Sequence, residues 1–355
     1  MLYAEPPWYP NLTRHTILCP DPPSNMSTPT FDHDTKASDL VRHYAANIVN
    51  KTILITGVSP SGLGDSFIRQ IAPSKPAKLI LAGRIPAKFQ KLVDEIASTH
   101  PEIKIKTLEL DLASFSNVRK AAEMVIASPD ISHIDVLVNN AGIMAVPFSL
   151  TEDGFEIQFQ TCHLGHFLFT NLIMNKILAS KEPRIVNISS NGHRLGTMRW
   201  TDHNFSDYEK WAAYGQAKTA NILMGIALAE KLGDRGLLAF SLHPGGIMTN
   251  LVSHHTGPFD NFVEDLRQAD ARVGTRFMWG FEKTGGKFKD LDEGVATHVF
   301  VAFDPTIAKS NGGYFDDCQL ADPFKEQVYP WATSKPDAEM LWTLSEKLVG
   351  QEFRY

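Results

Sequence analysis

Two side chains four residues apart, Tyr214 and Lys218, are the pair in this sequence best suited to acid–base chemistry. They lie in a run over residues 211–232 that reads as one helix, and positions i and i+4 share one face of a helix. A phenol ordinarily titrates near pH ~10. An ammonium at ~4 Å is worth roughly 4 kcal/mol at an effective dielectric constant of ~20. We therefore expect Lys218 to lower the pKa of Tyr214 towards neutrality, where a proton donor or acceptor works best. The alternative is a pair of surface neighbours without a role.

Short apolar runs alternate with stretches of helical spacing from Lys51 onwards. The runs are too short for helices, and several lack polar alternation, which is typical of strands buried on both faces. They fall at residues 53–55, 79–81, 103–110, 136–138, 185–188 and 237–242. The alternation predicts an α/β fold with a doubly wound parallel sheet and helices on both faces. Such a sheet binds ligands beyond the carboxyl ends of its strands.

A glycine-rich segment, residues 56–64, separates the first of these runs from helical spacing over residues 63–72. Many glycine-rich segments are merely turns. Between a first strand and a first helix, however, glycines let the backbone approach a pyrophosphate that sits on the amides of the helix N-terminus. The position of the segment therefore predicts a dinucleotide site.

The end of the second run bears on the choice of cofactor. An acidic residue there would bind the 2′-hydroxyl of NAD and repel an additional phosphate. Gly83 offers no carboxylate, and Arg84 carries a guanidinium suited to a phosphate. We therefore expect NADP (NADPH) rather than NAD. The alternative for Arg84 is a solvated charge at a strand end.

Composition excludes several other classes of function. The net charge of −6 and the lack of a basic run argue against nucleic acid as a partner. Three distant cysteines favour a reducing compartment over a disulfide framework or a zinc site, and the adjacent His254 and His255 lack partner ligands for a metal. No apolar run reaches membrane-spanning length, and the N-terminus has no secretory pattern. We expect a cytoplasmic protein without a metal or a membrane span.

The chain divides into two parts that differ in proline content and in apolar periodicity. Residues 1–45 form a proline-rich N-terminal extension, with seven prolines before residue 30, which we expect to be disordered in part. Met26 is a second plausible start. Residues 46–355 form the second part, which is long enough for one large α/β domain or two smaller ones. It contains a segment rich in aromatic residues, about 250–290, which could line a pocket for a bulky hydrophobic substrate or be ordinary core under a long loop.

From about residue 52 to 249 the chain resembles the classical short-chain dehydrogenase/reductase family. The resemblance rests on five motifs in order: TG and GLG within residues 56–64, NNAG at 139–142, ISS at 188–190, Tyr214 with Lys218, and PGG at 244–246. The segment HLGHF at 163–167 and the long gap between 190 and 214 are most similar to the retinol-dehydrogenase-like branch. The segment GYFDDC at 313–318, with residues 341–351, is similar to fungal members of that branch. The family implies that residues 46–355 form one Rossmann-like domain in which the segment at about 250–290 covers the substrate. It also implies hydride transfer between a nicotinamide and a carbonyl or alcohol carbon.

The resemblance implies a role for each matching position. Tyr214 would be the general acid in reduction and the base in oxidation, Lys218 would lower its pKa and hold the nicotinamide ribose, and Ser190 would bind the substrate oxygen. The remaining cofactor contacts would be Gly57, Gly62, Leu63 and Gly64 at the pyrophosphate, Arg84 at the 2′-phosphate, Asp111 and Asn140 at the adenosine side and the ribose region, and Ile247 and Thr249 at the carboxamide.

Two positions depart from the family pattern. The glycine loop is one residue longer than the commonest spacing and contains Pro60. Cys162 stands where the family usually has an asparagine that organises a water-mediated proton relay behind the lysine. Because a thiol is only a weak donor and acceptor, the relay would be rebuilt with water or be slower. The alternative for Cys162 is a small core residue in a helix.

We therefore expect an NADP(H)-dependent oxidoreductase that acts on a carbonyl or secondary alcohol of a hydrophobic small molecule. The resemblance makes fungal specialised metabolism a plausible setting. Two alternatives stay open: reduction of a carbon–carbon double bond, and a cofactor-binding regulatory protein with lost or weak turnover, which Cys162 motivates. The sequence leaves open the substrate, the physiological direction, and whether the chain forms a homo-oligomer.

Overall fold

The computed structural model describes residues 31–252, 259–274, 287–325 and 327–355. Residues 31–355 form one compact unit. Three features named above lie wholly or partly outside the described residues: the extension up to residue 30 with Met26, the pair His254 and His255, and the aromatic-rich segment at about 250–290, of which residues 253–258 and 275–286 are not described.

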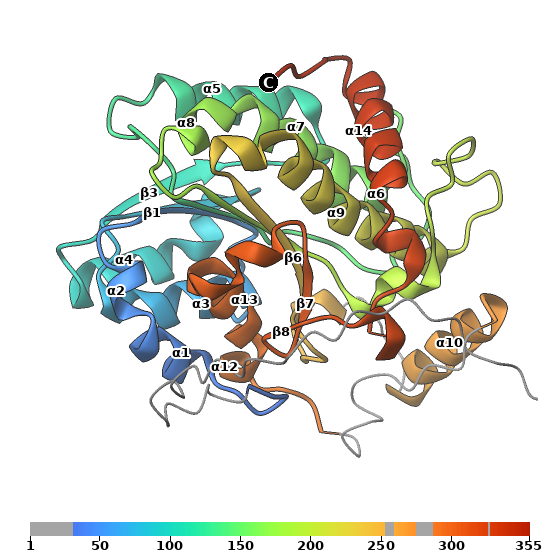
Figure 1. Ribbon diagram of the computed structural model, residues 1–355, viewed down its shortest axis with the longest axis horizontal. Helices are drawn as coiled ribbons and strands as arrows, with labels where there is room; N and C mark the ends of the chain where they lie inside the picture. Colours follow the sequence, from blue (N-terminus) through green and yellow to red (C-terminus); the bar gives the residue numbers. More distant parts are fainter. Residues whose placement is uncertain (1–30, 253–258, 275–286, 326) are drawn as a thin grey trace, which may run out of the picture. The chain divides into compact units, whose positions relative to one another are not determined.

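One sheet runs through this unit, and among the described residues it has eight strands in the order β3-β2-β1-β4-β5-β6-β7-β8 (Figure 1). Every neighbouring pair from β3 to β7 is parallel, and β8 is antiparallel to β7. The strands are β1 Thr52–Thr56, β2 Lys78–Gly83, β3 Lys104–Glu109, β4 Val136–Asn139, β5 Arg184–Ile188, β6 Leu238–His243, β7 Tyr314–Asp316 and β8 Gln319–Leu320. The first six lie where the apolar runs predicted them, and the Rossmann-like fold class is confirmed.

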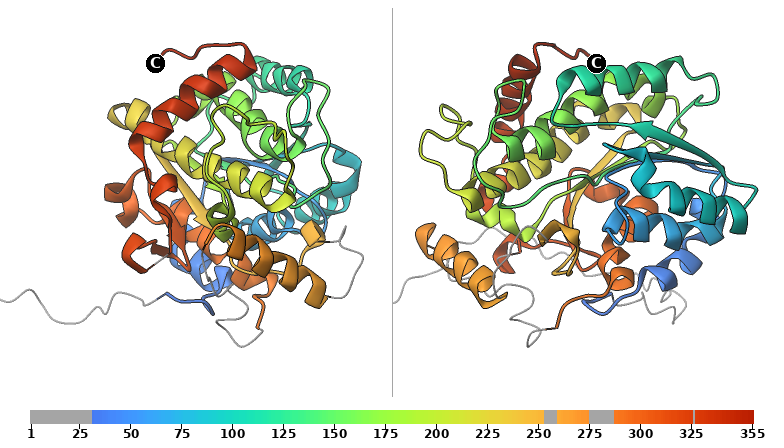
Figure 2. Two further views of the ribbon diagram at one scale, coloured as in Figure 1. Left: turned by 90° about the vertical axis from the view of Figure 1, so that its right-hand side faces the viewer. Right: turned by 180° about the vertical axis from the view of Figure 1, so that it is seen from behind.

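Helices cover both faces of the sheet (Figures 1 and 2). The described helices are α1 Ala37–His43, α2 Ala45–Ile48, α3 Leu63–Ile71, α4 Gln90–Thr99, α5 Phe115–Ala127, α6 Ile157–Phe159, α7 Gly165–Leu172, α8 Met174–Leu178, α9 Lys210–Leu232, α10 Phe259–Arg272, α12 Leu291–Gly294, α13 Ala296–Phe303 and α14 Lys335–Val349. Short 3₁₀ turns are η1 Ala72–Ser74, η2 Pro86–Phe89, η4 Asn191–Leu195, η5 Gly233–Arg235, η6 Asn250–Val252, η7 Thr306–Ser310, η8 Pro323–Lys325 and η9 Pro330–Ala332.

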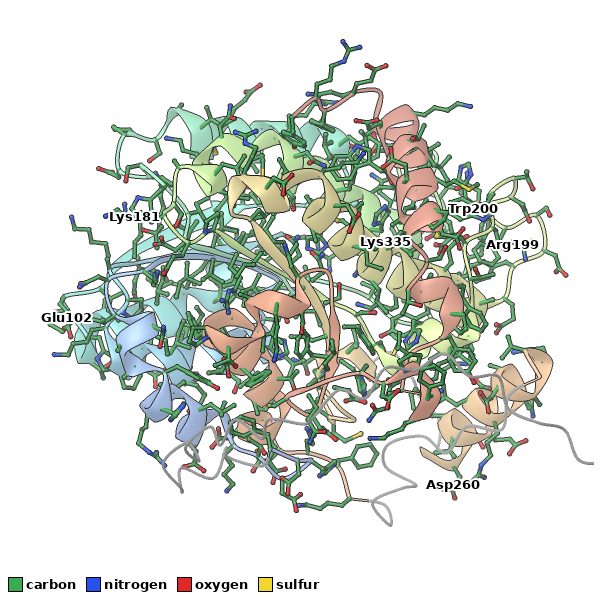
Figure 3. All side chains as sticks on the ribbon, viewed as in Figure 1. Glu102, Lys181, Arg199, Trp200, Asp260 and Lys335 are labelled. Carbon is green, nitrogen blue, oxygen red and sulfur yellow. The ribbon has the colours of Figure 1, made fainter. Side chains whose placement is uncertain are left out.

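The sheet separates two hydrophobic cores. One core contains residues of α5, α7, α8, α9 and α14, and the other contains residues of α1, α3, α4 and α13. Because both faces are covered, all residues of β1 and β5 are buried, and both strands are mostly apolar without a regular polar alternation. Charged side chains such as Glu102, Lys181 and Lys335 lie on the outside of the unit (Figure 3).

The long helix α9 is buried on nearly all sides, because the sheet lies beneath it and α14 lies across it. Its N-cap Glu209 accepts a hydrogen bond from the Ala212 amide at 2.7 Å, which satisfies one of the amides that a helix start leaves unpaired. Tyr214 and Lys218 are each only 4% exposed. The reading of this pair as surface neighbours is therefore excluded.

Three local features differ from expectation. Residues 31–48 belong to the compact unit, because α1 packs against α3 and α13, so the domain begins before residue 46. A π-helical turn, Gln160–Leu164, lies between α6 and α7, and apolar periodicity in the sequence does not reveal it. The β7–β8 hairpin turns at Asp317 and Cys318, both with positive φ. Neither is glycine, so the usual sequence signal for such a turn is missing.

The described residues contain neither a candidate membrane span nor a candidate metal cluster. None of the described helices has the length and apolar character needed to cross a membrane. In the same residues, histidine, cysteine and carboxylate side chains form no cluster of three or more that could hold a metal ion.

Four buried histidines make the stability of the fold dependent on pH. Burial lowers the pKa of His166 to about 4 and the pKa values of His163, His193 and His298 to about 3. These side chains are at most 1% exposed. Each of these histidines has a lower pKa in the folded protein than in the unfolded chain. Above pH ~6.5 the free energy of unfolding does not depend on them, and it decreases as the pH falls towards ~3–4, because the unfolded chain binds protons that the folded protein does not.

We expect the melting temperature to fall by about 10 °C between pH 7.5 and pH 5, since each such histidine lowers the free energy of unfolding by about 1.4 kcal/mol per pH unit below pH ~6.5. Calorimetry at the two pH values measures the change. His298→Gln should make the decrease shallower, whereas His43→Gln, at an exposed position of α1, should leave it as it is. Equal melting temperatures at both pH values would contradict this account.

Candidate functional site

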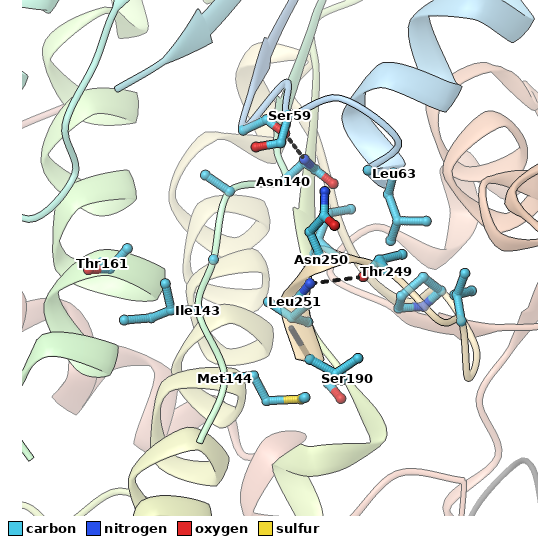
Figure 4. Close-up of a pocket in the computed structure, with 18 of the residues that line it drawn as sticks. Ser59, Leu63, Asn140, Ile143, Met144, Thr161, Ser190, Thr249, Asn250 and Leu251 are labelled. Carbon is cyan, nitrogen blue, oxygen red and sulfur yellow. Dashed lines mark hydrogen bonds between the residues drawn. The ribbon is translucent and has the colours of Figure 1, made fainter. Parts of the chain in front are cut away.

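A cavity of about 800 Å³ lies at the carboxyl ends of the strands. Its walls come from the segments that follow β1 to β6, and it spans the gap between β1 and β4, where the strand order reverses. Ligands of parallel α/β sheets bind at this place. Figure 4 shows Ser59, Leu63 and Asn140 at one end of the cavity and Met144 and Ser190 at the other.

The structure brings together nearly all the expected site residues. The cavity is lined by Gly57, Gly62, Leu63, Arg84, Asp111, Asn140, Ser190, Tyr214, Lys218, Ile247 and Thr249. Gly64 is the exception. A side chain at Gly64 would come within 2.7 Å of the Gly57 carbonyl oxygen, so this glycine allows α3 to pack closely against the loop and does not itself line the cavity.

The glycine loop leaves backbone amides for an anion. Gly57 has φ +76°, and a side chain there would collide with Ala141. Gly62 caps α3 without a side-chain hydrogen bond, so the first amides of this nine-residue helix keep no partner within the helix. They lie at the cavity wall, together with the positive end of the helix dipole. This donor set fits a dinucleotide pyrophosphate.

A buried network holds the loop against the turn that follows β4. The Thr56 hydroxyl accepts hydrogen bonds from the amides of Asn140 and Ala141, each at 3.0 Å, and lies 2.8 Å from His166 Nε2. Because two donors occupy the Thr56 oxygen, its own proton goes to Nε2, and His166 Nδ1–H donates to the Cys162 carbonyl at 3.0 Å. Asn140 Nδ2 donates to the carbonyls of Thr56 and Gly57. Its amide group therefore shapes the loop rather than pointing a free donor into the cavity.

The end of the cavity beyond β2 and β3 carries the charges expected for an adenosine phosphate. Arg84 and Lys88 are both exposed and both line the cavity. Asp111 Oδ1 accepts the Ala113 amide at 3.0 Å, and the Asp111 amide donates to Asn117 at 2.6 Å. Lys88 was not expected from the sequence, because it lies in η2 beyond the strand end.

The three expected catalytic residues meet at the opposite end. The side chains of Ser190 and Tyr214 line the cavity side by side, close enough for Ser190 to influence the phenol, and Lys218 Nζ lies 5.6 Å from the centroid of the Tyr214 ring. Ser190 Oγ accepts the Gly192 amide at 2.9 Å. The Ser190 hydroxyl proton is thus left for the phenol or for a substrate oxygen.

The predicted lowering of the Tyr214 pKa is not found. Burial raises the pKa of the Tyr214 phenol above its ordinary value, and the hydrogen bond from Ser190 opposes the increase. Lys218 Nζ donates to the Ile188 carbonyl at 3.1 Å, and burial lowers the pKa of Lys218. The lower pKa predicted from the sequence holds only for a pair that keeps part of its hydration. In the fold, the cost of removing both groups from water is the larger effect.

Hydrogen bonds between α9 and the end of β5 fix this arrangement. The Ser189 hydroxyl donates to the Lys218 carbonyl at 2.8 Å, and Asn221 Nδ2 donates to the Ile188 carbonyl at 3.0 Å. Thr219 Oγ1 donates to the carbonyls of His193 and Gly196. The helix therefore cannot rotate or slide without breaking buried polar contacts, so Tyr214 stays opposite Ser190.

The loop after β6, residues 244–252, forms another wall of the cavity. Thr249 Oγ1 accepts the Leu251 amide at 3.3 Å (Figure 4), which leaves its proton for a carbonyl oxygen. Asn250 Nδ2 donates to the Pro60 carbonyl at 3.0 Å and so joins this loop to the glycine loop. Asn250 could not be recognised from the sequence, because it and Pro60 are 190 positions apart.

The wall next to Ser190 and Tyr214 is mostly apolar. Trp211 packs edge-on against Tyr214 and against Phe262 of α10, at ring distances of 6.3 and 5.4 Å. Met144 and Leu266 complete this cluster. Phe262 and Leu266 of the 250–290 segment therefore line the cavity, and the covering of the substrate by this segment stays a prediction.

Cys162 is fully buried in the π-helical turn behind Lys218. Its sulfur accepts the Ile143 amide and donates to the Ile143 carbonyl, each at 3.5 Å. Burial raises the pKa of the thiol, and the charge of Lys218 opposes the increase. The thiol is therefore neutral and holds the backbone that follows β4.

Comparison with known proteins gives relatives that cover most of the chain. The family model described as short chain dehydrogenase matches residues 51–257. Short-chain dehydrogenase/reductase prx1 of Penicillium rubens is 35% identical over 312 residues, covering 84% of this chain and 85% of that protein. Retinol dehydrogenase 14 of Homo sapiens is 35% identical over 315 residues, with 84% and 86% covered. A solved structure of an uncharacterised protein from Mycobacterium paratuberculosis is 29% identical, covers 88% of this chain and 98% of its own, and has a TM-score of 0.63.

Cys162→Asn tests the departure from the usual relay residue. We expect kcat to rise a few-fold, because an amide donates and accepts hydrogen bonds more strongly than a thiol. Steady-state kinetics at saturating cofactor measures the change. Cys162→Ala removes the thiol without adding an amide and serves as the control. An unchanged kcat in Cys162→Asn would show that the thiol is already compensated.

Proposed function

Since the chain belongs to the short-chain dehydrogenase/reductase family, we propose that it is an NADP(H)-dependent oxidoreductase that interconverts a carbonyl and a secondary alcohol on a hydrophobic small molecule. The observation that carries the proposal is the meeting of Ser190, Tyr214 and Lys218 on one cavity with the glycine loop. A nicotinamide cofactor, when bound, would supply or accept the hydride.

The chain's own residues would manage the oxygen atom of the substrate. In reduction, negative charge develops on the carbonyl oxygen as its carbon gains a hydride, and nearby donors stabilise that charge. The Ser190 hydroxyl would donate a hydrogen bond to this oxygen, and the Tyr214 hydroxyl would give up its proton to form the alcohol. Because burial raises the Tyr214 pKa, a positive charge close to the phenolic oxygen is needed to make the proton mobile. Lys218 is the cation best placed to provide it.

The cavity supports a substrate that is hydrophobic around the reacting carbon. Met144, Trp211, Phe262 and Leu266 line this end. The charged side chains that line the cavity are Arg84, Lys88 and Asp111 beyond β2 and β3, and Lys218 in the catalytic group. Among the described side chains that line this end, a substrate carboxylate beside the apolar wall would lose its hydration and find only Lys218 as a charged partner.

Two alternatives remain to be tested against this proposal. A regulatory protein that only binds the cofactor would keep the glycine loop and lose turnover, and the raised pKa of Tyr214 is the observation in its favour. Reduction of a carbon–carbon double bond would use the same cofactor site. Specialised metabolism in a fungus and a cytoplasmic location are part of our proposal. The similarity to a Penicillium protein supports the fungal setting.

Tyr214→Phe separates an enzyme from a binding protein. We expect kcat for ketone or aldehyde reduction to fall by about 100- to 10,000-fold, the usual contribution of a general acid, while the Kd for NADPH stays within about two-fold. NADPH absorbance with a panel of ketones, aldehydes and enones measures turnover, and cofactor fluorescence measures binding. Cofactor binding by the wild-type protein without turnover on the whole panel would favour the regulatory alternative. Turnover on enones alone would favour the double-bond reductase.

Arg84→Ala tests the cofactor preference. We expect KM for NADPH to rise about 10- to 100-fold with little change for NADH, because a hydrogen bond between charged groups is worth about 1.5–3 kcal/mol. Lys91→Ala changes the net charge equally at an exposed position of α4 that does not line the cavity and is the matched control. Equal effects of Arg84→Ala on both cofactors would remove Arg84 from the site.

A further inference from the structure

The segment GYFDDC, residues 313–318, stands out in the sequence but has no part in the proposed chemistry. In the structure it forms β7 and the turn of the β7–β8 hairpin at the edge of the sheet, beside β6 (Figure 1). Asp317 and Cys318 have φ values of 47° and 59°. Such conformations are costly for residues other than glycine, so the surrounding contacts must hold the turn in place.

One contact leads from the hairpin to the loop that follows β6. Asp317 accepts an ion-paired hydrogen bond from Lys289 Nζ at 2.6 Å, and the side chain of Lys289 is only 1% exposed. The Lys289 amide donates to the Gly246 carbonyl at 2.9 Å, in an isolated parallel bridge with Ile247. The stem of Lys289 lies so close to Gly245, which has φ +103°, that a side chain there would collide with it. Lys289 therefore supports the turn that leads to Ile247 and Thr249.

A second contact leads from the hairpin to the loop that carries Ser190. The Tyr314 hydroxyl donates to Asn191 Oδ1 at 3.3 Å. Asp316 lies two residues further along β7, on the same face of the strand as Tyr314, and its carboxylate lies near the Asn191 side chain. The Asn191 amide donates to His243 Nδ1 at 3.2 Å. Asn191 directly follows Ser190 and lines the cavity, so its orientation and that of Ser190 are coupled through one peptide bond.

The two carboxylates of the hairpin lie in one charged environment. Burial, and then the charge of Asp317, raise the pKa of Asp316 to about 6, while Lys289, the hydrogen bond from Asn191 and Arg194 act in the opposite direction. Asp316 and Asp317 are adjacent in sequence, yet each supports a different wall of the cavity. An ordinary edge hairpin would need neither contact.

We propose that the β7–β8 hairpin positions both active-site loops, with Asp317 acting through Lys289 on the loop of Ile247 and Thr249, and Asp316 acting through Asn191 on the loop of Ser190. These are positioning residues, since they touch neither substrate nor cofactor. Their effect on activity rests on the proposed function. Their effect on the two loops does not.

Asp317→Asn and Asp316→Asn test the two branches separately. Asparagine keeps the shape at both positions and tolerates the positive φ of residue 317, while it removes one charge. We expect Asp317→Asn to raise KM and Kd for NADPH about 10-fold, with kcat changed less than three-fold. We expect Asp316→Asn to lower kcat about 10-fold, with Kd for NADPH within two-fold of the wild type.

Two further variants provide a rescue and a control. Lys289→Met combined with Asp317→Asn removes the buried charge that Asp317→Asn leaves without its partner. It should recover much of the lost NADPH affinity. Glu339→Gln breaks the ion pair of Lys231 and Glu339, which joins α9 to α14 away from the cavity. It should leave KM, Kd and kcat within two-fold.

Hydrogen–deuterium exchange provides a readout that does not depend on turnover. Exchange over residues 244–249 should be at least 10-fold faster in Asp317→Asn, and exchange over residues 190–192 should be faster in Asp316→Asn, with no change in Glu339→Gln. If both variants exchange at the wild-type rate in both loops, the proposal is wrong, whether or not the protein turns over NADPH. A lower melting temperature with unchanged exchange, Kd and kcat would also overturn it, because the hairpin would then be only structural. If the loops exchange faster while the wild-type protein neither binds nor oxidises NADPH, the proposed function fails and the positioning role stands.

Discussion

The packing of α9 against the end of β5 is the constraint on which the candidate site depends. The Ile188 carbonyl receives hydrogen bonds from both Lys218 and Asn221, and Ser189 binds the backbone of the helix in return. Because buried polar groups must keep their partners, this contact fixes the rotation and height of the helix. Tyr214 then faces Ser190 without further adjustment. The other cavity walls are arranged around this pair.

Burial strengthens and also complicates the chemistry. In a low-dielectric cavity, each donor aimed at the substrate oxygen has a larger effect than in water. The same burial raises the pKa of Tyr214, which makes its proton harder to release, and lowers the pKa of Lys218, which makes its positive charge harder to keep. Neither shift by itself favours proton transfer to a substrate. The site therefore depends on the additional charges and hydrogen bonds that its ligands would bring. This dependence is consistent with a proton transfer that is coupled to binding.

Long-range polar contacts join the loops into one frame. Thr56 and His166 join the glycine loop to the helix that carries Cys162, Asn250 joins the last loop to Pro60, and the β7–β8 hairpin reaches the loops after β5 and β6. Loops at the ends of parallel strands have few backbone partners of their own. Side-chain contacts of this kind supply the rigidity that a hydride-transfer site needs, since small displacements are costly in rate.

The sequence by itself determined the order and place of the first six strands, the helix that carries Tyr214 and Lys218, and the gathering of most site residues at one edge of the sheet. Apolar runs, helical spacing and glycine positions are local signals, and a parallel sheet brings the ends of its strands together whatever the details. Only the tertiary structure decided the direction of the Tyr214 pKa shift, because that depends on how much of α9 is covered by the sheet and α14. It also decided the pairs Thr56 with His166, Pro60 with Asn250, and Lys289 with Asp317, which are 110, 190 and 28 residues apart. Contacts at such separations follow from strand order and loop path, and no periodicity along the chain encodes them.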